Sequence, residues 1–232
     1  MEKVKATRLE REKDDFFKSL LESLRGISKK YLYTLPPDQI IPNIADIYFH
    51  PTVKEALSAV ETDEGLEEAL TRIQPSLPEI VDDCLKLSRQ LLANLVIDEY
   101  TMHNKTFDLS VLTLASTLFL CKSCRSDQTL DQAVAHRCRV PYYSRLPEGL
   151  EAKAVWRAIG ELTTACRIRT MISFSLTRLE PFTSVLHSCG IDPNTVTAAD
   201  MNATDPVIEC LDCSNIERGR ITMNWLSNIC GK

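Results

Sequence analysis

Two cysteines and a following histidine–cysteine pair constrain this chain more than any other feature of its sequence. Cys121 and Cys124 are separated by two residues, and eleven further residues lead to His136, which is followed closely by Cys138. A Cys-x-x-Cys turn can present two thiolates to one ion, and zinc takes four tetrahedral ligands from thiolate and imidazole groups. The sequence therefore predicts a structural Zn2+ site made by Cys121, Cys124, His136 and Cys138.

The spacing of His136 and Cys138 restricts the backbone around them. On a continuous helix, side chains two positions apart point about 200° away from each other, so both can bind one ion only at a helix end or in a turn. Residues 130–135 are compatible with a helix, which would place His136 at its C-terminal end. The alternative zinc site uses Cys121, Cys124 and His136 with a fourth ligand from elsewhere in the chain.

A second group of cysteines lies near the end of the sequence. Cys210 and Cys213 form another Cys-x-x-Cys pair, and sixteen residues separate Cys213 from Cys230, which is a finger-like spacing. Only two residues follow Cys230, so no fourth ligand is expected beyond it. Three outcomes compete: a second zinc site completed by water, His187 or Cys189; one site joining Cys121 and Cys124 to Cys210 and Cys213; or no metal at these cysteines.

The composition agrees with a reduced intracellular protein. The chain has 232 residues and nine cysteines, and its first residues lack the apolar segment of a signal peptide. Clustered cysteines in the reducing cytoplasm or nucleus usually bind metal or are buried thiols, so we expect a cytoplasmic or nuclear location. No apolar run reaches the roughly 18–20 residues of a membrane helix, and no two of the seven glycines are close enough for a phosphate-binding loop.

Apolar periodicity predicts a mostly α fold, a multi-helix bundle with one or two small zinc-binding finger-like elements in the C-terminal half. Apolar residues recur at helical spacing between charged ones, and prolines and capping residues mark the ends. The helices are expected over residues 3–31, 38–49, 51–60, 62–73, 77–96, 109–120, 150–179, 181–190 and 197–201. For 109–120 the length favours a helix, and a buried strand is the alternative because of its Val, Thr and Phe content.

Two of these segments carry predictions about the core. In the helix over 77–96 we expect one buried face made by Ile80, Cys84, Leu87, Leu91 and Leu95, with Cys84 acting as a small core hydrophobe. The segment 150–179 is expected to bury Trp156, Ile159, Leu162, Cys166, Ile172 and Leu176.

Charge is distributed unevenly along the chain. Residues 34–110 contain 5 basic and 14 acidic side chains, whereas residues 121–178 contain 10 basic and 5 acidic ones. We therefore distinguish an acidic helical region, 1–110, from a helical region with the Cys/His elements, 111–232, within one continuous globular unit. The alternative explanation of this charge distribution is that solvent-exposed helix faces happen to carry charges of opposite sign.

The function expected from these features is that of a zinc-stabilised adaptor module that binds another protein. A nucleic-acid-binding regulator is the alternative, favoured by the finger-like spacing and the basic balance of 121–178. A zinc-dependent enzyme is the third interpretation. Because catalytic zinc keeps an open position and usually has a carboxylate base nearby, the four-ligand set predicts no catalytic residues and no further cofactor.

Three stretches carry a resemblance to a known family. They are residues 33–46 (YTLPPDQIIPNIAD), residues 112–124 (LTLASTLFLCKSC) with His136 and Cys138, and residues 189–201 (CGIDPNTVTAADM) with Cys210, Cys213 and Trp225. With them the chain resembles, over about residues 15–230, an uncharacterised family of basidiomycete fungal proteins described as F-box-associated or C2H2 zinc-finger-like. The resemblance implies that both cysteine pairs are halves of zinc fingers. The second motif of the family ends in histidines after the tryptophan, where this chain has Cys230.

Overall fold

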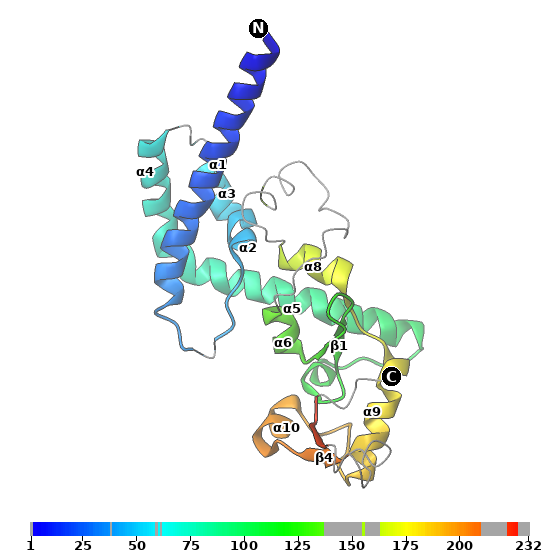
Figure 1. The fold of residues 1–232 in the computed structure, drawn as a ribbon. Coiled ribbons are helices and arrows are strands. Elements are labelled where there is room, and N and C mark those ends of the chain that lie inside the picture. Colours follow the sequence, from blue (N-terminus) through cyan, green and yellow to red (C-terminus); the bar gives the residue numbers. More distant parts are fainter. Residues whose placement is uncertain are drawn as a thin grey trace. The chain divides into compact units, whose positions relative to one another are not determined.

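The computed structural model describes residues 2–37, 39–58, 60, 62–136, 155, 163–209 and 222–226, and of residues 2–14 and 222–224 only the backbone. It is mostly helical, as the sequence predicts (Figure 1). The chain divides into two compact units, residues 1–88 with 141–167 and residues 89–140 with 168–232. The boundary predicted at residue 110 was placed where the charge of the sequence changes. The division into two compact units does not test that boundary.

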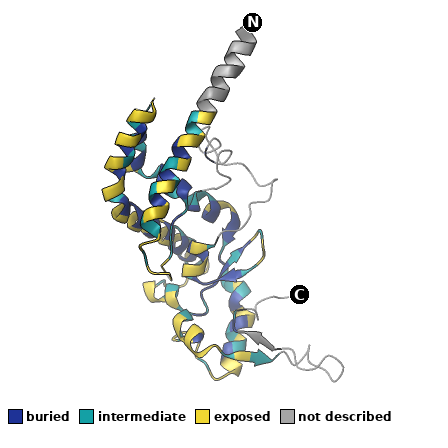
Figure 2. Cartoon of the chain, turned by 60° about the vertical axis from the view of Figure 1, so that its left-hand side comes forward, coloured by how far each residue is buried: buried dark blue, intermediate teal, exposed yellow. Residues whose placement is uncertain are grey.

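Unit 1 is built from helices around one apolar cluster. Its helices are α1 (Glu2–Leu32), α2 (Ile44–Phe49), α3 (Pro51–Leu57), α4 (Asp63–Ile73) and the first part of α5 (Leu77–Met102). On α1 the side chains of Leu20, Leu21 and Leu24 are buried in this cluster, three and four positions apart, as an amphipathic helix requires. Figure 2 shows the buried faces of these helices in dark blue and the exposed face of α4 in yellow.

The ends of these helices follow from local chemistry. Thr62 caps α4 as predicted, since its side chain accepts a hydrogen bond from the Gly65 N–H at 3.2 Å. The helix predicted from residue 38 begins only at Ile44, because Pro42 disfavours helix in the residue before it and Asn43 provides the cap. A 3-10 turn, η1 (Gln74–Ser76), joins α4 to α5.

The buried face of α5 differs from the predicted one. Ile80 and Cys84 are buried as expected, but Leu87 is 57% exposed, and Leu91 and Leu95 are only half-buried. The buried positions of the helix are Leu77, Ile80, Val81, Cys84, Leu85, Ser88, Leu92, Ala93 and Val96. The prediction for Leu87 is wrong because the buried face of the helix includes Ser88 instead. Ser88 is polar, and its hydroxyl donates to the Cys84 carbonyl at 2.8 Å.

A partly buried carboxylate of unit 1 caps the start of α8 (Thr164–Met171). Asp46 of α2 accepts hydrogen bonds from the Thr164 N–H at 2.6 Å and from the Thr164 hydroxyl at 2.5 Å. Asn43 donates to the same hydroxyl at 3.3 Å. Two segments far apart in the sequence are thereby joined, and an unsatisfied N–H at the helix start gains an acceptor.

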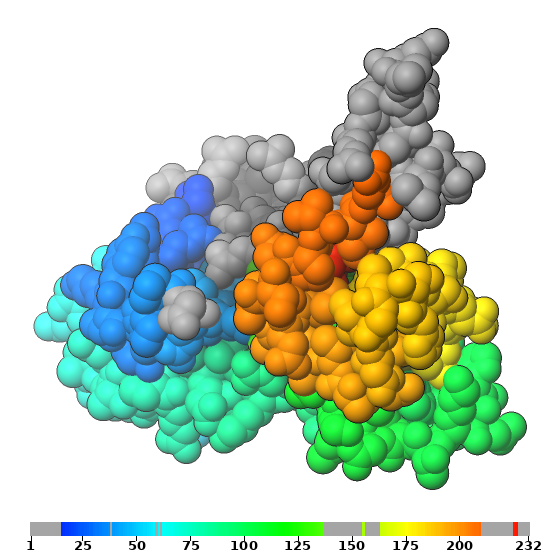
Figure 3. Space-filling model, turned by 90° about the horizontal axis from the view of Figure 1, so that it is seen from below, coloured from blue at the N-terminus to red at the C-terminus, as the bar shows by residue number. Residues whose placement is uncertain are grey.

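Unit 2 contains a small antiparallel sheet and short helices. Its three-stranded sheet has the order β2 (Asp127–Gln128), β1 (Phe119–Cys121), β3 (Ile172–Ser173), with Leu120 opposite both Asp127 and Ser173. The other elements are η2 (Leu109–Thr113), α6 (Leu130–Ala135), α9 (Leu176–Ser188), α10 (Ala198–Thr204) and a ribbon of β4 (Val207–Glu209) and β5 (Thr222–Asn224). Figure 3 shows α9 in yellow and α10 in orange at the surface.

Two helix predictions are wrong: the one over 150–179, which spans both units, and the one over 109–120, where the alternative of a strand is confirmed at Phe119 and Leu120. The segment 109–120 forms the 3-10 turn η2 and then the central strand β1, because hydroxyl side chains in it bond elsewhere: Ser116 donates to the Pro193 carbonyl at 3.0 Å. The helix predicted over 150–179 is interrupted by β3 at Ile172 and Ser173, which pairs with β1. Ile172 is nevertheless buried as predicted, whereas Trp156, Ile159 and Leu162 lie outside the described residues.

The last two predicted helices are largely confirmed. Helix α9 ends at Ser188, before Gly190 with φ of 72°, but it begins at Leu176 and contains Pro181 rather than starting there. Helix α10 is capped by Thr197, whose side chain and that of Asp200 each accept from the other's backbone N–H. In the described part of the chain, no helix is both long and apolar enough to cross a membrane.

Candidate metal centre

A tight hairpin positions the two cysteines of the first Cys-x-x-Cys pair. We call residues 119–128, which comprise β1, β2 and their turn, the cysteine hairpin. Cys121 ends β1, its N–H donates to the Ser126 carbonyl at 3.0 Å, and its carbonyl accepts from the Arg125 N–H at 2.7 Å. Arg125 has φ of 57°, a left-handed conformation that costs a non-glycine residue about 1–2 kcal/mol. This turn folds Cys124 back toward Cys121.

The hairpin is held on both sides of the cysteines. Strand β1 is the middle strand of its sheet, and the Lys122 N–H donates to the Met171 carbonyl at 2.8 Å, next to β3. Cys121 is fully buried, whereas Cys124 is exposed. A metal site at this turn would therefore have one cysteine ligand in the core and the other at the surface.

Helix α6 brings the histidine to the hairpin. Thr129 and Gln132 form a capping box at its start, and the helix ends after Ala135, so His136 has the extended backbone of a C-cap. This confirms the predicted position of His136 at a helix end. The Nε2 atom of His136 lies 3.4 Å from the Sγ atom of Cys124.

The three side chains have a geometry that could hold one metal ion. The ligand atoms of Cys121, Cys124 and His136 all lie within 4.8 Å of one another. Zinc–sulfur and zinc–nitrogen bonds in tetrahedral geometry place a thiolate and an imidazole nitrogen about 3.6 Å apart. The observed 3.4 Å between Cys124 and His136 is close to this value, and two soft thiolates with one imidazole suit zinc.

The remaining predicted ligands are not part of this described cluster. Cys138, Cys210, Cys213 and Cys230 lie outside the described residues, so their assignments stay predictions. His187 lies in the last turn of α9, and Cys189 is exposed at its C-cap. Within the described ranges, no other set of three His, Cys, Asp or Glu side chains is grouped closely enough to hold a metal.

Polar side chains of the hairpin surround the candidate ligands. Ser126 places its hydroxyl 2.8 Å from the Cys124 sulfur. Gln128 is buried, and its Nε2 atom lies 3.0 Å from the Ser126 hydroxyl and 2.7 Å from the Nδ1 atom of His136. Its other amide atom, Oε1, is buried and has no hydrogen-bond donor among the described residues. Neither Ser126 nor Gln128 was predicted from the sequence.

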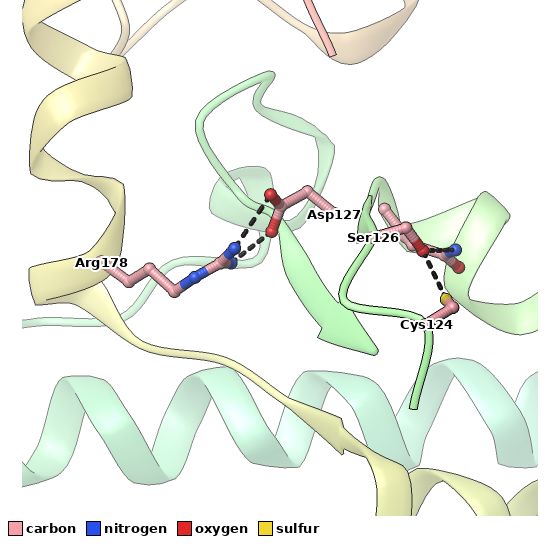
Figure 4. A network of polar contacts seen from close by, with 5 residues as sticks. Cys124, Ser126, Asp127 and Arg178 are labelled. Atoms are coloured by element: carbon pink, nitrogen blue, oxygen red, sulfur yellow. Dashed lines mark hydrogen bonds and ion pairs between the residues drawn. The ribbon is translucent and has the colours of Figure 1, made fainter. Parts of the chain in front are cut away.

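An ion pair anchors the opposite side of the hairpin. Asp127 points toward α9 and makes two contacts with the Arg178 guanidinium, whereas Ser126 points toward Cys124 (Figure 4). The Asp127 side chain is only 2% exposed. Because successive side chains of a strand alternate, Asp127 and Gln128 serve opposite faces of β2. That alternation after a Cys-x-x-Cys turn is the signal from which Gln128 could have been found.

Cys84 confirms the prediction of a core thiol. It is buried in α5, and burial, together with the nearby carboxylates Asp46 and Asp83, raises the pKa of its thiol to about 12. At neutral pH this thiol stays protonated, so it is neither a metal ligand nor a nucleophile. The Nε2 atom of His50 lies 3.6 Å from the Asp83 carboxylate.

No family model, no curated protein and no solved structure matches this chain. The assignment of the site therefore depends on its own geometry. That geometry supplies two thiolates and one imidazole for an ion, and an amide and a hydroxyl around them.

Proposed function

We propose that the protein binds one Zn2+ ion through Cys121, Cys124 and His136, with Cys138 as the fourth ligand, and that this zinc is structural. The observation that carries the proposal is the convergence of the three described ligands on one point. Cys138 follows His136 by two residues, and the extended backbone at His136 supports bringing both side chains to one ion. The side chain nearest to the imidazole is the amide of Gln128, which is not a catalytic base.

A structural zinc of this kind would contribute much of the stability of the chain. Zinc-binding free energies in finger peptides are about 10–16 kcal/mol, and whole domains are stable by about 5–15 kcal/mol. Strands β1 and β2 have only three and two residues, and Arg125 is in a costly conformation. Zinc would hold the hairpin and α6 together, in addition to the sheet pairing and the ion pair of Asp127 with Arg178.

The functional role that we propose is a protein-interaction or adaptor module in the cytoplasm or nucleus. This role rests on the four-ligand set, which suits a structural zinc and not a catalytic one.

Elemental analysis of the purified chain tests the metal assignment. We expect at least one zinc per chain in the wild type, and a Cys124→Ser variant that has one zinc fewer and melts at a much lower temperature. Cys189→Ser is the matched control, because Cys189 is an exposed cysteine of the same unit outside the cluster, and it should keep the zinc. A wild type without zinc, melting as Cys124→Ser does, would contradict the proposal.

Nucleic-acid binding is a second candidate with one supporting observation. The exposed cationic side chains Lys122 and Arg125 lie on the turn of the cysteine hairpin. Against it, the six-residue α6 exposes Asp131, which pairs with Arg89 at 3.3 Å and would repel phosphate. DNA or RNA binding that weakens steeply with salt would favour this candidate, and no binding at low salt would exclude it.

Two further proposals concern relatives and the second cysteine group. We propose that the chain is a member of the basidiomycete family described above, on the strength of the three motifs. We also propose that Cys210, Cys213 and Cys230 contribute to a second zinc site, with a joined site at Cys121 and Cys124 as the alternative. Two zinc ions per chain would support a separate second site.

A further inference from the structure

We infer that Gln128 is the outer-shell positioning residue of the metal centre, and that the oxygen of its side-chain amide accepts from the His136 imidazole when the metal is bound. The inference rests on the proposed function, because it requires an ion at His136. It assigns a role to a residue that is not a ligand.

The contacts of Gln128 identify the state of the imidazole in the present arrangement. The amide Nε2 of Gln128 lies 2.7 Å from His136 Nδ1, so an amide N–H donates and Nδ1 accepts. A neutral imidazole whose Nδ1 accepts carries its proton on Nε2. The other ring nitrogen, Nε2, lies 3.4 Å from the Cys124 sulfur.

Binding of a metal reverses these roles. The ring nitrogen next to the Cys124 sulfur is Nε2, so the ion binds there and the remaining proton moves to Nδ1. An Nδ1–H group would then face the two N–H bonds of the Gln128 amide at 2.7 Å, and donor would oppose donor.

A half-turn of the amide about its last side-chain bond removes this conflict. The oxygen and nitrogen of the amide exchange places, and Oε1 then accepts from His136 Nδ1–H and from the Ser126 hydroxyl. The same turn gives partners to the Oε1 atom, which has no donor among the described residues in the present arrangement. Zinc-bound histidines usually donate their second N–H to such an acceptor, and loss of the acceptor weakens metal binding about 10- to 100-fold.

Two substitutions of Gln128 separate the accepting role from mere packing. Gln128→Glu keeps the shape and can only accept, whereas Gln128→Leu can neither accept nor donate. We expect Gln128→Leu to bind Zn2+ about 10- to 100-fold more weakly, and Gln128→Glu to bind at least as tightly as the wild type. Zinc dissociation constants of the full chain, measured by competition with a chromophoric chelator, give these values, with Gln90→Leu as the exposed glutamine control.

Nitrogen-15 NMR of the imidazole tests the geometry of this contact without relying on affinity. His136 of the zinc-bound wild type should carry its proton on Nδ1, the nitrogen that faces Gln128, and a His136→Asn variant assigns the signal. This measurement needs only the wild type, so it stands even where Gln128→Leu fails to fold.

The outcomes distinguish this inference from the proposed function. Equal zinc affinity of Gln128→Leu and the wild type, or a Gln128→Glu variant weakened as much as Gln128→Leu, would overturn the inference alone. Zinc bound through Nδ1 of His136 would do the same. A wild type that binds no zinc would overturn the proposed function, and the inference with it.

Discussion

At the residue scale, the cysteines of this chain have different chemistry because their surroundings differ. Cys124 is exposed beside an imidazole and a hydroxyl, whereas Cys84 is buried among apolar side chains and near two carboxylates. Burial and negative neighbours both disfavour the thiolate, the form that binds metal and attacks electrophiles. The fold thus keeps one cysteine inert and makes another available.

Cys84 should therefore resist alkylation in the folded protein. With a pKa of about 12, only about one molecule in ten thousand carries the Cys84 thiolate at pH 8. We expect iodoacetamide at pH 8 to modify the exposed Cys189 first and to leave Cys84 unmodified until urea is added. Peptide mass spectrometry measures both sites, and equal rates in the native protein would contradict the expectation.

Asp46 should make stability fall as pH rises. Burial raises its pKa above 3.8, although hydrogen bonds from Thr164 and the charge of Arg167 oppose this shift. The folded state then binds the proton more tightly than the unfolded state, so the contribution is full below about pH 3.8 and is lost as pH rises through the folded-state pKa.

The variant Asp46→Asn isolates this effect, because an amide oxygen can still accept from the Thr164 N–H and does not titrate. We expect the stability of Asp46→Asn relative to the wild type to increase with pH above 3.8. Urea unfolding of both proteins at several pH values measures it. A difference that is constant or decreases with pH would show that Asp46 does not titrate in this way.

At the scale of elements, the cysteine hairpin depends on one ion pair for its attachment to α9. The Asp127 carboxylate is almost fully buried, and the Arg178 guanidinium is one-third exposed. Removing one partner of a buried pair is more costly than removing both, because a lone buried charge remains.

Arg178→Met should therefore destabilise the chain by about 3 kcal/mol. The double variant Asp127→Asn with Arg178→Met should regain a large part of this loss, since no charge is left buried. Arg89→Met is the control, because Arg89 and Asp131 are both exposed and such pairs contribute about 0–1 kcal/mol. Urea midpoints give the three values, and equal losses in Arg178→Met and Arg89→Met would exclude a special role for the buried pair.

Elements with strong local signals could be predicted from the sequence. The capped helices α4 and α10, and the helix end at His136, follow from side chains within a few residues of each element. The strand β1 could not, because an apolar run of this length fits a helix or a buried strand equally. Its strand conformation is decided by β2 and β3, which are distant pairing partners.

The same distinction applies to the candidate site. The spacing of Cys121, Cys124 and His136 predicted a cluster, and the structure brings these three together. Gln128 was missed because the alternation that identifies it holds only in a strand, and strand β2 was not predicted from the sequence. Its contact with the His136 imidazole requires that β1, β2 and α6 pack together.

At the scale of the whole molecule, the candidate ligands and the apolar cluster of unit 1 belong to different units. The cluster of unit 1 involves residues of α1 to α5 and includes none of Cys121, Cys124 and His136. Proteins open locally in contiguous cooperative parts, each with its own free energy. Stability that comes from zinc should therefore be confined to the part that contains the ligands.

Removal of the metal should change hydrogen exchange in unit 2 and leave the helices of unit 1 protected. We expect a zinc chelator to speed exchange in peptides covering residues 119–136, because the hairpin and α6 have few backbone bonds of their own. Peptides covering α1 and α4 should exchange at the same rate with and without the chelator, since their buried leucines and isoleucines do not depend on the ion.

Mass spectrometry of exchanged peptides measures both, and Cys124→Ser, which has no zinc to lose at this site, should show no further change with chelator. Faster exchange throughout unit 1 would show that the zinc supports the entire chain, and unchanged exchange in residues 119–136 would show that the hairpin is stable without it.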